Sequence, residues 1–157
     1  MTHLPLAQTH HRAGTWSGDS DICDLTYDAR FLRRKKLVSE TGLEFVVDLA
    51  ATTSLDEGDA LELTDGRLIR IRAAREAVLV VTGPDLARLA WHIGNRHTPC
   101  QVEADRLIIQ ADPVIAHMLE HLGAALRHDR LPFTPEGGAY GHGRTHAHAH
   151  GATAHAN

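Results

Sequence analysis

Residues 77–93 read AVLVVTGPDLARLAWHI, a strand pattern followed at once by a helix pattern. Ala77 to Thr82 is an unbroken apolar run, which is typical of a buried strand. Gly83 and Pro84 interrupt this run, and a proline suits the first turn of a helix. One helix face is then marked by apolar residues at helical spacing: Leu86, Leu89, Ala90 and Ile93. Gly94 is predicted to end this helix.

The residues after this helix predict a hairpin, a second helix and a final strand. Residues 100–110 have the hairpin pattern. Asp112 and Pro113 suit the N-cap and first position of a helix, and Gly123 is predicted to end it. Residues 124–133 can form the last strand. The order β-α-β-β-α-β predicts a ferredoxin-like domain.

The residues before Ala77 have a different pattern, without helical periodicity. Apolar residues alternate with polar ones on both sides of the turn signal Asp65-Gly66, which predicts a β-hairpin. The chain as a whole is therefore expected to be α+β. The expected divisions are a poorly ordered start (1–20), an all-β domain (21–73), the ferredoxin-like domain (74–136) and a flexible, disordered histidine-rich tail (137–157).

Composition limits the classes of function. The 157 residues suffice for one domain or two small ones, and the net charge of −4 argues against nucleic acid as a partner. No apolar run is long enough to cross a bilayer, and residues 1–20 do not resemble a secretory signal. The two cysteines have no CxxC spacing. A cytoplasmic protein that does not enter membranes is expected.

Histidines are concentrated near the end of the chain, separated by small residues: His142, His146, His148, His150 and His155. Neutral imidazole is a good ligand for Ni, Cu and Zn ions. A solvated string of such ligands suits capture and transfer of a metal. The alternatives are a purification tag and a low-complexity accident, although histidines in a tag are usually contiguous.

His97 is the main candidate outside this segment. It follows the predicted helix end at Gly94, in a loop between regular elements, where functional residues are common. A single histidine is more often a surface residue than a ligand. In a two-fold dimer, however, two copies of His97 could meet and form a shared, open metal site, which the tail histidines could complete.

Other metal-binding candidates have simpler explanations. His92 lies beside the apolar face of its helix and is interpreted as structural. His117 and His121 are four residues apart on the second predicted helix, but without an HExxH pattern a structural role is favoured. His128 has no evident partner. Cys100 could add a thiolate to a metal site, but a buried structural cysteine is favoured.

The basic run Arg33-Arg34-Lys35-Lys36 leaves several interpretations open. It could contact nucleic acid or be a targeting signal, although a solvated turn or strand face is commoner. An RNA-recognition module would need aromatic residues on its central strands. The predicted central strands, AVLVVT and RLIIQ, have none.

Several segments together resemble the UreE family of urease nickel metallochaperones. They are residues 59–67 (DALELTDGR), 91–99 (WHIGNRHTP), 118–123 (MLEHLG), 131–140 (LPFTPEGGAY) and the histidine-rich end. The resemblance implies an N-terminal domain that binds a peptide or partner. It also implies that the ferredoxin-like domain (74–136) binds metal, that the protein is a homodimer with His97 at its interface, and that the tail histidines take part in metal binding. One departure is that residues 110–113 (QADP) lack a histidine pair that some members have there.

The resemblance implies delivery of Ni(II) to the urease apoprotein complex, through the urease accessory GTPase and without catalysis. Cu(II) and Zn(II) also favour imidazole and could bind in vitro. The main alternative is a Ni or Zn buffering or storage protein without a dedicated client. A metal-dependent hydrolase would need a fixed ligand shell and a general base, and neither occurs at a convincing spacing. A peptide-binding adaptor with incidental metal binding is a further alternative.

Overall fold

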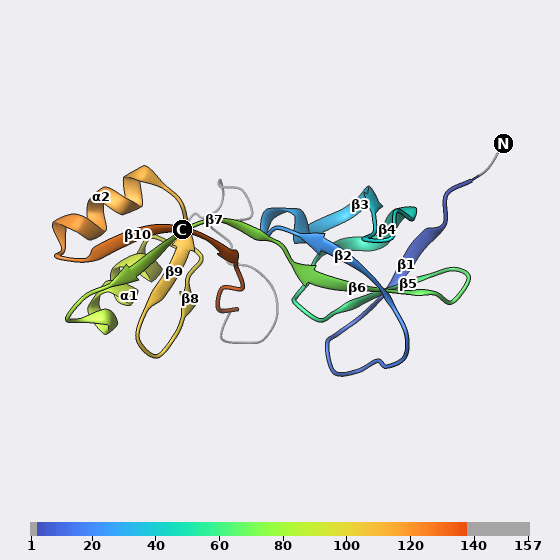
Figure 1. The fold of residues 1–157 in the computed structure, drawn as a ribbon, viewed down its shortest axis with the longest axis horizontal. Helices are drawn as coiled ribbons and strands as arrows, with labels where there is room; N and C mark the ends of the chain where they lie inside the picture. Colours follow the sequence, from blue (N-terminus) through green and yellow to red (C-terminus); the bar gives the residue numbers. More distant parts are fainter. Residues whose placement is uncertain (1–2, 138–157) are drawn as a thin grey trace. The chain divides into compact units, whose positions relative to one another are not determined.

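A computed structural model describes residues 3–137 (Figure 1). The chain divides into two compact units between Ala74 and Arg75. The first unit consists almost entirely of strands, and the second combines strands with two helices. This division agrees with the expected α+β composition. None of the helices in residues 3–137 is long and apolar enough to span a membrane.

The first unit is a six-stranded sheet with the order β2-β6-β5-β1-β4-β3. Its strands are β1 (Leu6–His11), β2 (Asp21–Leu25), β3 (Phe31–Val38), β4 (Glu44–Ser54), β5 (Ala60–Leu63) and β6 (Leu68–Ala73), with a short 3-10 helix, η1 (Asp28–Arg30). The pairs β1–β4 and β2–β6 are parallel, and the others are antiparallel. The turn predicted at Asp65-Gly66 joins β5 to β6, with Gly66 at φ 92°.

Strand β1 shows that the expectation of a poorly ordered N-terminus was wrong. It lies inside the sheet between β5 and β4. Only Ala7 of β1 is buried, so no apolar alternation marks this strand in the sequence. Polar contacts hold its end instead: His10 Nε2 donates to Asp59 at 2.7 Å, and His11 Nε2 donates to Glu62 at 2.8 Å.

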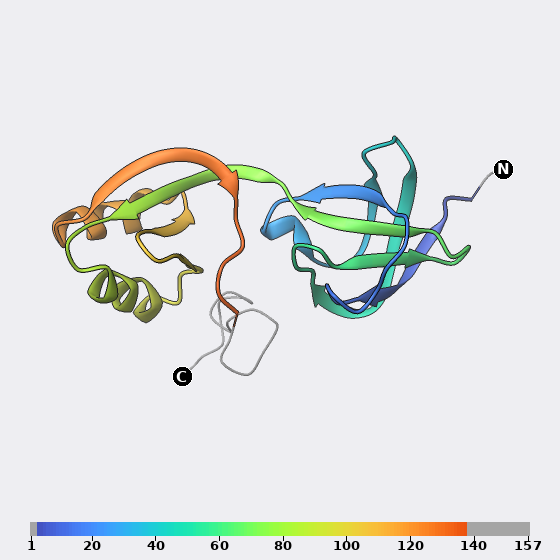
Figure 2. The same cartoon turned by 60° about the horizontal axis from the view of Figure 1, so that its bottom comes forward.

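The second unit has the predicted order of strands and helices. It contains β7 (Arg75–Thr82), α1 (Leu86–Asn95), β8 (Gln101–Val102), β9 (Leu107–Gln110), α2 (Pro113–His121) and β10 (Ala125–Pro132). The strands form an antiparallel sheet with the order β10-β7-β9-β8. Figure 2 shows α1 beneath the arch of β7.

The apolar core of the second unit joins one face of this sheet to both helices. Its buried members are Leu79, Val81, Leu107 and Ile109 from the strands and Leu89, Ile93, Ile115 and Leu119 from the helices. The helix face that the sequence predicted for residues 86–93 therefore points into the core. Asp112 caps α2 as predicted, accepting hydrogen bonds from the amides of Val114 and Ile115. Helix α1 begins at Leu86 with Asp85 as its N-cap, so Pro84 precedes the helix and does not lie in its first turn.

Candidate metal centre

The sequence predicted that helix α1 ends at Gly94, but the structure shows a longer helix. It continues to Asn95, with Arg96 as the C-cap. His97 then adopts a left-handed backbone conformation, with φ 59°. Its amide donates to the carbonyl of Gly94 at 2.9 Å, and the amide of Thr98 donates to the carbonyl of Ile93 at 3.3 Å. This pair of hydrogen bonds is the Schellman motif, which commonly ends helices.

Helix α2 ends in the same motif but with the expected residue. Gly123 has φ 89°, and its amide donates to the carbonyl of Glu120 at 3.0 Å. The amide of Ala124 donates to the carbonyl of Leu119, also at 3.0 Å. His97 thus occupies a position that favours glycine, where a side chain costs about 1–2 kcal/mol. It is the one non-glycine residue with positive φ in the described part of the chain, and such strain often accompanies function.

The His97 side chain is available for a ligand. It is exposed, and it forms no hydrogen bond or ion pair with any other residue of 3–137. Trp91, on the same helix, is 63% exposed and packs edge-on against the half-buried His92, with ring centroids 5.1 Å apart. The end of α1 therefore combines an unengaged imidazole with an exposed indole.

The segment after β10 runs beside the loop that contains His97. Phe133 is fully buried, and the amide of Thr134 donates to Oε1 of Gln101 at 2.9 Å. The amide of Glu136 donates to the carbonyl of Cys100, three positions after His97, at 2.9 Å. These contacts fix the origin of the histidine-rich segment close to His97. Sequence reasoning missed them, because a backbone amide and carbonyl leave no trace in composition.

The tail histidines lie outside the described residues: His142, His146, His148, His150 and His155. Chain length still allows a test of their reach. An extended chain spans about 3.5 Å per residue, so His142, six positions after Glu136, can lie up to about 20 Å from that anchor. The nearest tail histidine therefore has enough chain to reach the end of α1.

The other candidates do not form a metal site by themselves. In residues 3–137, no three histidine, cysteine or acidic side chains are grouped so that they could hold a metal ion. His117 and His128 line a hollow of about 430 Å³ between α2 and the sheet, together with Asp112 and Glu120. Burial, and secondarily the carboxylate of Glu136, raises the pKa of the Cys100 thiol to about 11. That thiol is protonated near neutral pH, which disfavours it as a ligand.

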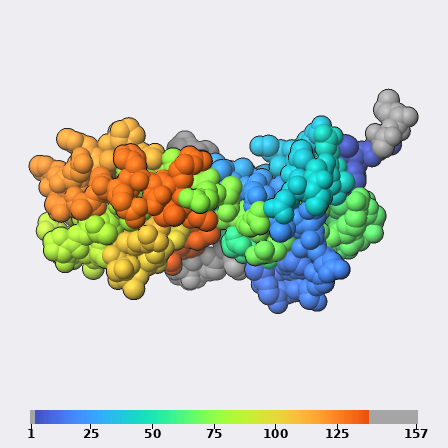
Figure 3. All heavy atoms as spheres, viewed as in Figure 1, coloured from blue at the N-terminus to red at the C-terminus, as the bar shows by residue number. Residues whose placement is uncertain are grey.

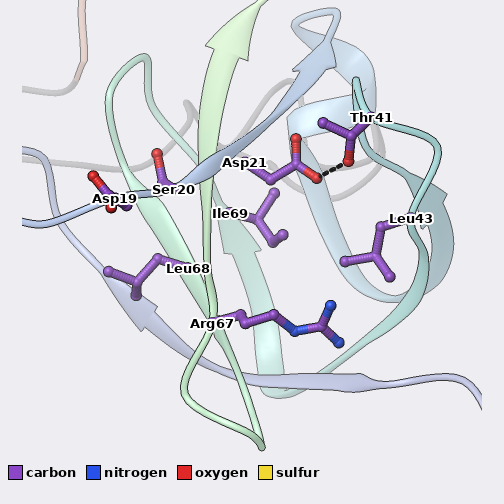
Figure 4. Close-up of a pocket in the computed structure, with 8 residues that line it drawn as sticks. All are labelled: Asp19, Ser20, Asp21, Thr41, Leu43, Arg67, Leu68 and Ile69. Carbon is purple, nitrogen blue, oxygen red and sulfur yellow. Dashed lines mark hydrogen bonds between the residues drawn. The ribbon is translucent and has the colours of Figure 1, made fainter.

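A second hollow, of about 280 Å³, lies in the first unit at the start of β2 and β6. Figure 4 shows Ile69 at its centre, with Asp21 and Arg67 on either side. Asp21 accepts hydrogen bonds from the hydroxyls of Ser39 and Thr41, and Arg67 is paired with Asp65 at 2.8 Å. Asp21 and Arg67 are therefore already engaged with neighbouring side chains.

Comparison with known proteins gives matches over both units. Residues 3–74 match the family model "UreE urease accessory protein, N-terminal domain", and residues 70–157 match the corresponding C-terminal model. A urease accessory protein UreE from Ruegeria pomeroyi is 62% identical over 147 residues, covering 94% of this chain and 99% of the relative. One from Cereibacter sphaeroides is 60% identical over 152 residues, covering 96% and 83%. One from Paracoccus denitrificans is 64% identical over 121 residues, covering 77% of each.

Proposed function

The chain belongs to the UreE family of urease accessory proteins, and we propose that it serves urease maturation by carrying Ni(II) to the enzyme's active site. The cargo passes to the urease apoprotein complex through the urease accessory GTPase. The protein itself performs no catalysis in this scheme. Nickel is bound reversibly and given up, so an exposed and incompletely filled ligand set is an advantage.

One observation carries the proposal: an exposed, unengaged imidazole at a backbone position that favours glycine. His97 has both ring nitrogens free of contacts within residues 3–137. One imidazole holds a metal weakly, and a homodimer would supply a second His97 across a two-fold axis. The exposed Trp91 on the same helix supports this arrangement, because tryptophan is enriched at protein–protein interfaces.

The histidine-rich tail would provide further ligands and concentrate metal near His97. Its origin is held at Cys100 and Gln101, so tethered imidazoles act at a high effective concentration. We propose His142 as the first to reach the site, with His146, His148, His150 and His155 as additional ligands. Cu(II) and Zn(II) are expected to compete in vitro.

We also propose that the second unit has a ferredoxin-like fold, which the strand order β10-β7-β9-β8 supports. The division at residues 73–74 and the end of the metal-binding domain at 136 remain predictions, as does a cytoplasmic location. The N-terminal unit serves partner binding.

A buffering or storage role is the alternative, and one observation favours it. No three-ligand group exists in the portion of the chain that the structure describes, so most metal could bind to the tail alone. A storage protein needs no contribution from His97 and no client.

Nickel titration calorimetry on four forms tests the proposal: the full chain, the chain truncated after Tyr140, His97→Ala, and His128→Ala as a matched control at an exposed histidine. Truncation should lower the number of bound ions but leave a site near one per dimer. His97→Ala should remove that site, and His128→Ala should not. If His97→Ala binds like the wild type and truncation removes all binding, the folded unit is not the metal centre.

Transfer of bound nickel to the urease apoprotein distinguishes a nickel carrier from a nickel storage protein. Nickel-loaded protein is added to the urease apoprotein and accessory proteins together with a chelator that withdraws free nickel. A carrier activates urease despite the chelator, and His97→Ala does so much less. Activation that the chelator abolishes equally for both forms would favour the buffering role.

A further inference from the structure

The backbone of Glu136 is held beside the loop that contains His97. Its amide donates to the carbonyl of Cys100, three positions after His97, at 2.9 Å. Phe133, three positions before Glu136, is fully buried and fixes the chain on the other side. The side chain of Glu136 itself is exposed, and the orange-red atoms of this last described part of the chain lie on the surface in Figure 3. An exposed carboxylate thus starts from a fixed backbone position.

The carboxylate of Glu136 also lies on the same side as the Cys100 side chain. Burial is the main cause of the raised pKa of the Cys100 thiol, and the negative charge of Glu136 raises this pKa further. An exposed charge is screened by water and acts strongly only on near neighbours. The electrostatic effect therefore agrees with the hydrogen bond in placing this carboxylate close to the loop.

This carboxylate is unengaged, in contrast to the nearest acidic group of the β8–β9 hairpin. Within residues 3–137, the side chain of Glu136 forms no hydrogen bond or ion pair. Glu103 of the hairpin accepts hydrogen bonds from Arg106 at 2.7 Å and from Gln101 at 2.6 Å. Glu136 therefore offers an acceptor for which no side chain of the described residues competes.

A histidine that binds a metal through one ring nitrogen usually donates the N–H of its other ring nitrogen to a carboxylate, a carbonyl or water. Such a partner fixes the tautomer and the orientation of the ring, and it raises the basicity of the nitrogen that binds the metal. The side chain of His97 has no hydrogen-bond partner among residues 3–137. An unengaged imidazole and an unengaged carboxylate therefore belong to neighbouring, fixed segments of the chain.

We propose that Glu136 is a positioning residue for the nickel site. Its carboxylate accepts the N–H of one ring nitrogen of His97 when the other ring nitrogen binds Ni(II). This role rests on the proposed function of His97, but it does not require the tail histidines. Direct coordination of the metal by Glu136 is disfavoured, because imidazole suits nickel whereas carboxylate suits magnesium, calcium and manganese.

Competition between the full chain and a colorimetric nickel chelator tests this role by measuring the affinity of the tightest site. Glu136→Ala keeps the amide that bonds to Cys100 but removes the carboxylate, so nickel affinity should fall by about 10–100-fold, as for other partners of metal-binding histidines. The matched control is Glu120→Ala, which removes another exposed carboxylate of the same unit. It should change the affinity by less than about twofold, because distant exposed charges are screened.

A double-mutant cycle shows whether Glu136 acts through His97. The variants His97→Ala and His97→Ala/Glu136→Ala should bind nickel equally, because the carboxylate has no imidazole to orient once His97 is lost. A further loss in the double variant would overturn the positioning role. If His97→Ala loses the site while Glu136→Ala binds like the wild type, this role is wrong and the proposed function stands. If neither variant changes binding, both are wrong.

The conservative variant Glu136→Gln separates positioning from direct coordination. Its side-chain carbonyl still accepts a hydrogen bond from an imidazole, so it should lose clearly less affinity than Glu136→Ala. Equal losses in the two variants would identify Glu136 as a direct ligand and overturn the positioning role.

Discussion

The two helices of the second unit end in the same hydrogen-bonded motif but with different residues. At the end of α2 the left-handed position is filled by Gly123, and at the end of α1 it is filled by His97. A Cβ added at Gly123 would meet no atom within 4 Å, so glycine there satisfies a backbone preference alone. Histidine at the equivalent place in α1 carries the conformational penalty.

The comparison shows how function can be separated from folding in one motif. If both ends served only to stop a helix, glycine would suit both. The imidazole at α1 is exposed and contributes no contact within residues 3–137 that would offset its strain. We therefore expect substitutions at the two ends to act on different properties, as the following predictions state.

Replacing His97 with glycine should have the largest effect, on metal binding. The backbone motif is kept and the imidazole is lost, so nickel affinity at the shared site should fall by at least about 100-fold, the upper range seen when groups supporting a ligand are lost. Calorimetry of the chain truncated after Tyr140 measures this site alone. Gly123→Ala in the same background serves as the control and should retain the affinity. A loss in both variants would mean that the site depends on general stability.

Acid should weaken metal binding at the end of α1, because the ligand proposed there is an imidazole. Histidine ligands bind metal when deprotonated, and an ordinary histidine has a pKa of about 6.5. Lowering the pH from about 7.5 to about 5.5 should weaken nickel binding by roughly tenfold for each histidine ligand. Titrations at both pH values test this. Affinity that does not change with pH would argue against histidine ligation.

Replacing Gly123 with alanine should destabilise the fold without affecting the metal site. The added methyl group meets nothing, so the expected loss of about 1–2 kcal/mol in unfolding free energy is purely conformational. Urea denaturation without metal measures it. Gly123→Asn should lose less, since asparagine tolerates the left-handed region. If the alanine variant were as stable as the wild type, the expected conformational preference for glycine at residue 123 would be wrong.

The smallest expected effect is on stability at the other end. His97→Gly relieves strain but makes the unfolded chain more flexible, so we expect a net gain of about 0.5–1 kcal/mol without metal. The same urea experiment measures it, with His97→Asn as a control that should match the wild type. A clear loss of stability in the glycine variant would show that the imidazole supports the fold.

The sequence predicted α2 better than α1 for a physical reason. Asp112, Pro113 and Gly123 each have one strong local preference, and the structure uses all of them. Gly94 has the same preference as Gly123, but it lies within the last turn of α1. Ile93, directly before it, is buried in the core, and the helix continues to Asn95. A glycine predicts where a helix can stop, whereas tertiary contacts decide whether it does.

Strand β1 and the anchor of the tail were beyond prediction for related reasons. The strand buries Ala7 and otherwise relies on hydrogen bonds to Asp59 and Glu62, which are about 50 positions away in the sequence. The anchor relies on Gln101 and a backbone carbonyl. Contacts between residues far apart in the sequence leave no periodic signal. His97, by contrast, was identifiable because it follows a predicted helix end and because its segment resembles a known family.

The left-handed backbone at residue 97 restricts which donor atoms this position can ever present. Besides glycine, the residues that enter this region most readily are asparagine, aspartate and histidine. Of these, only histidine and aspartate are common metal ligands, and they favour different ions: imidazole suits nickel, copper and zinc, whereas carboxylate suits magnesium, calcium and manganese. A designer retuning the position would choose between these two sets, since cysteine and glutamate lack the conformational tolerance.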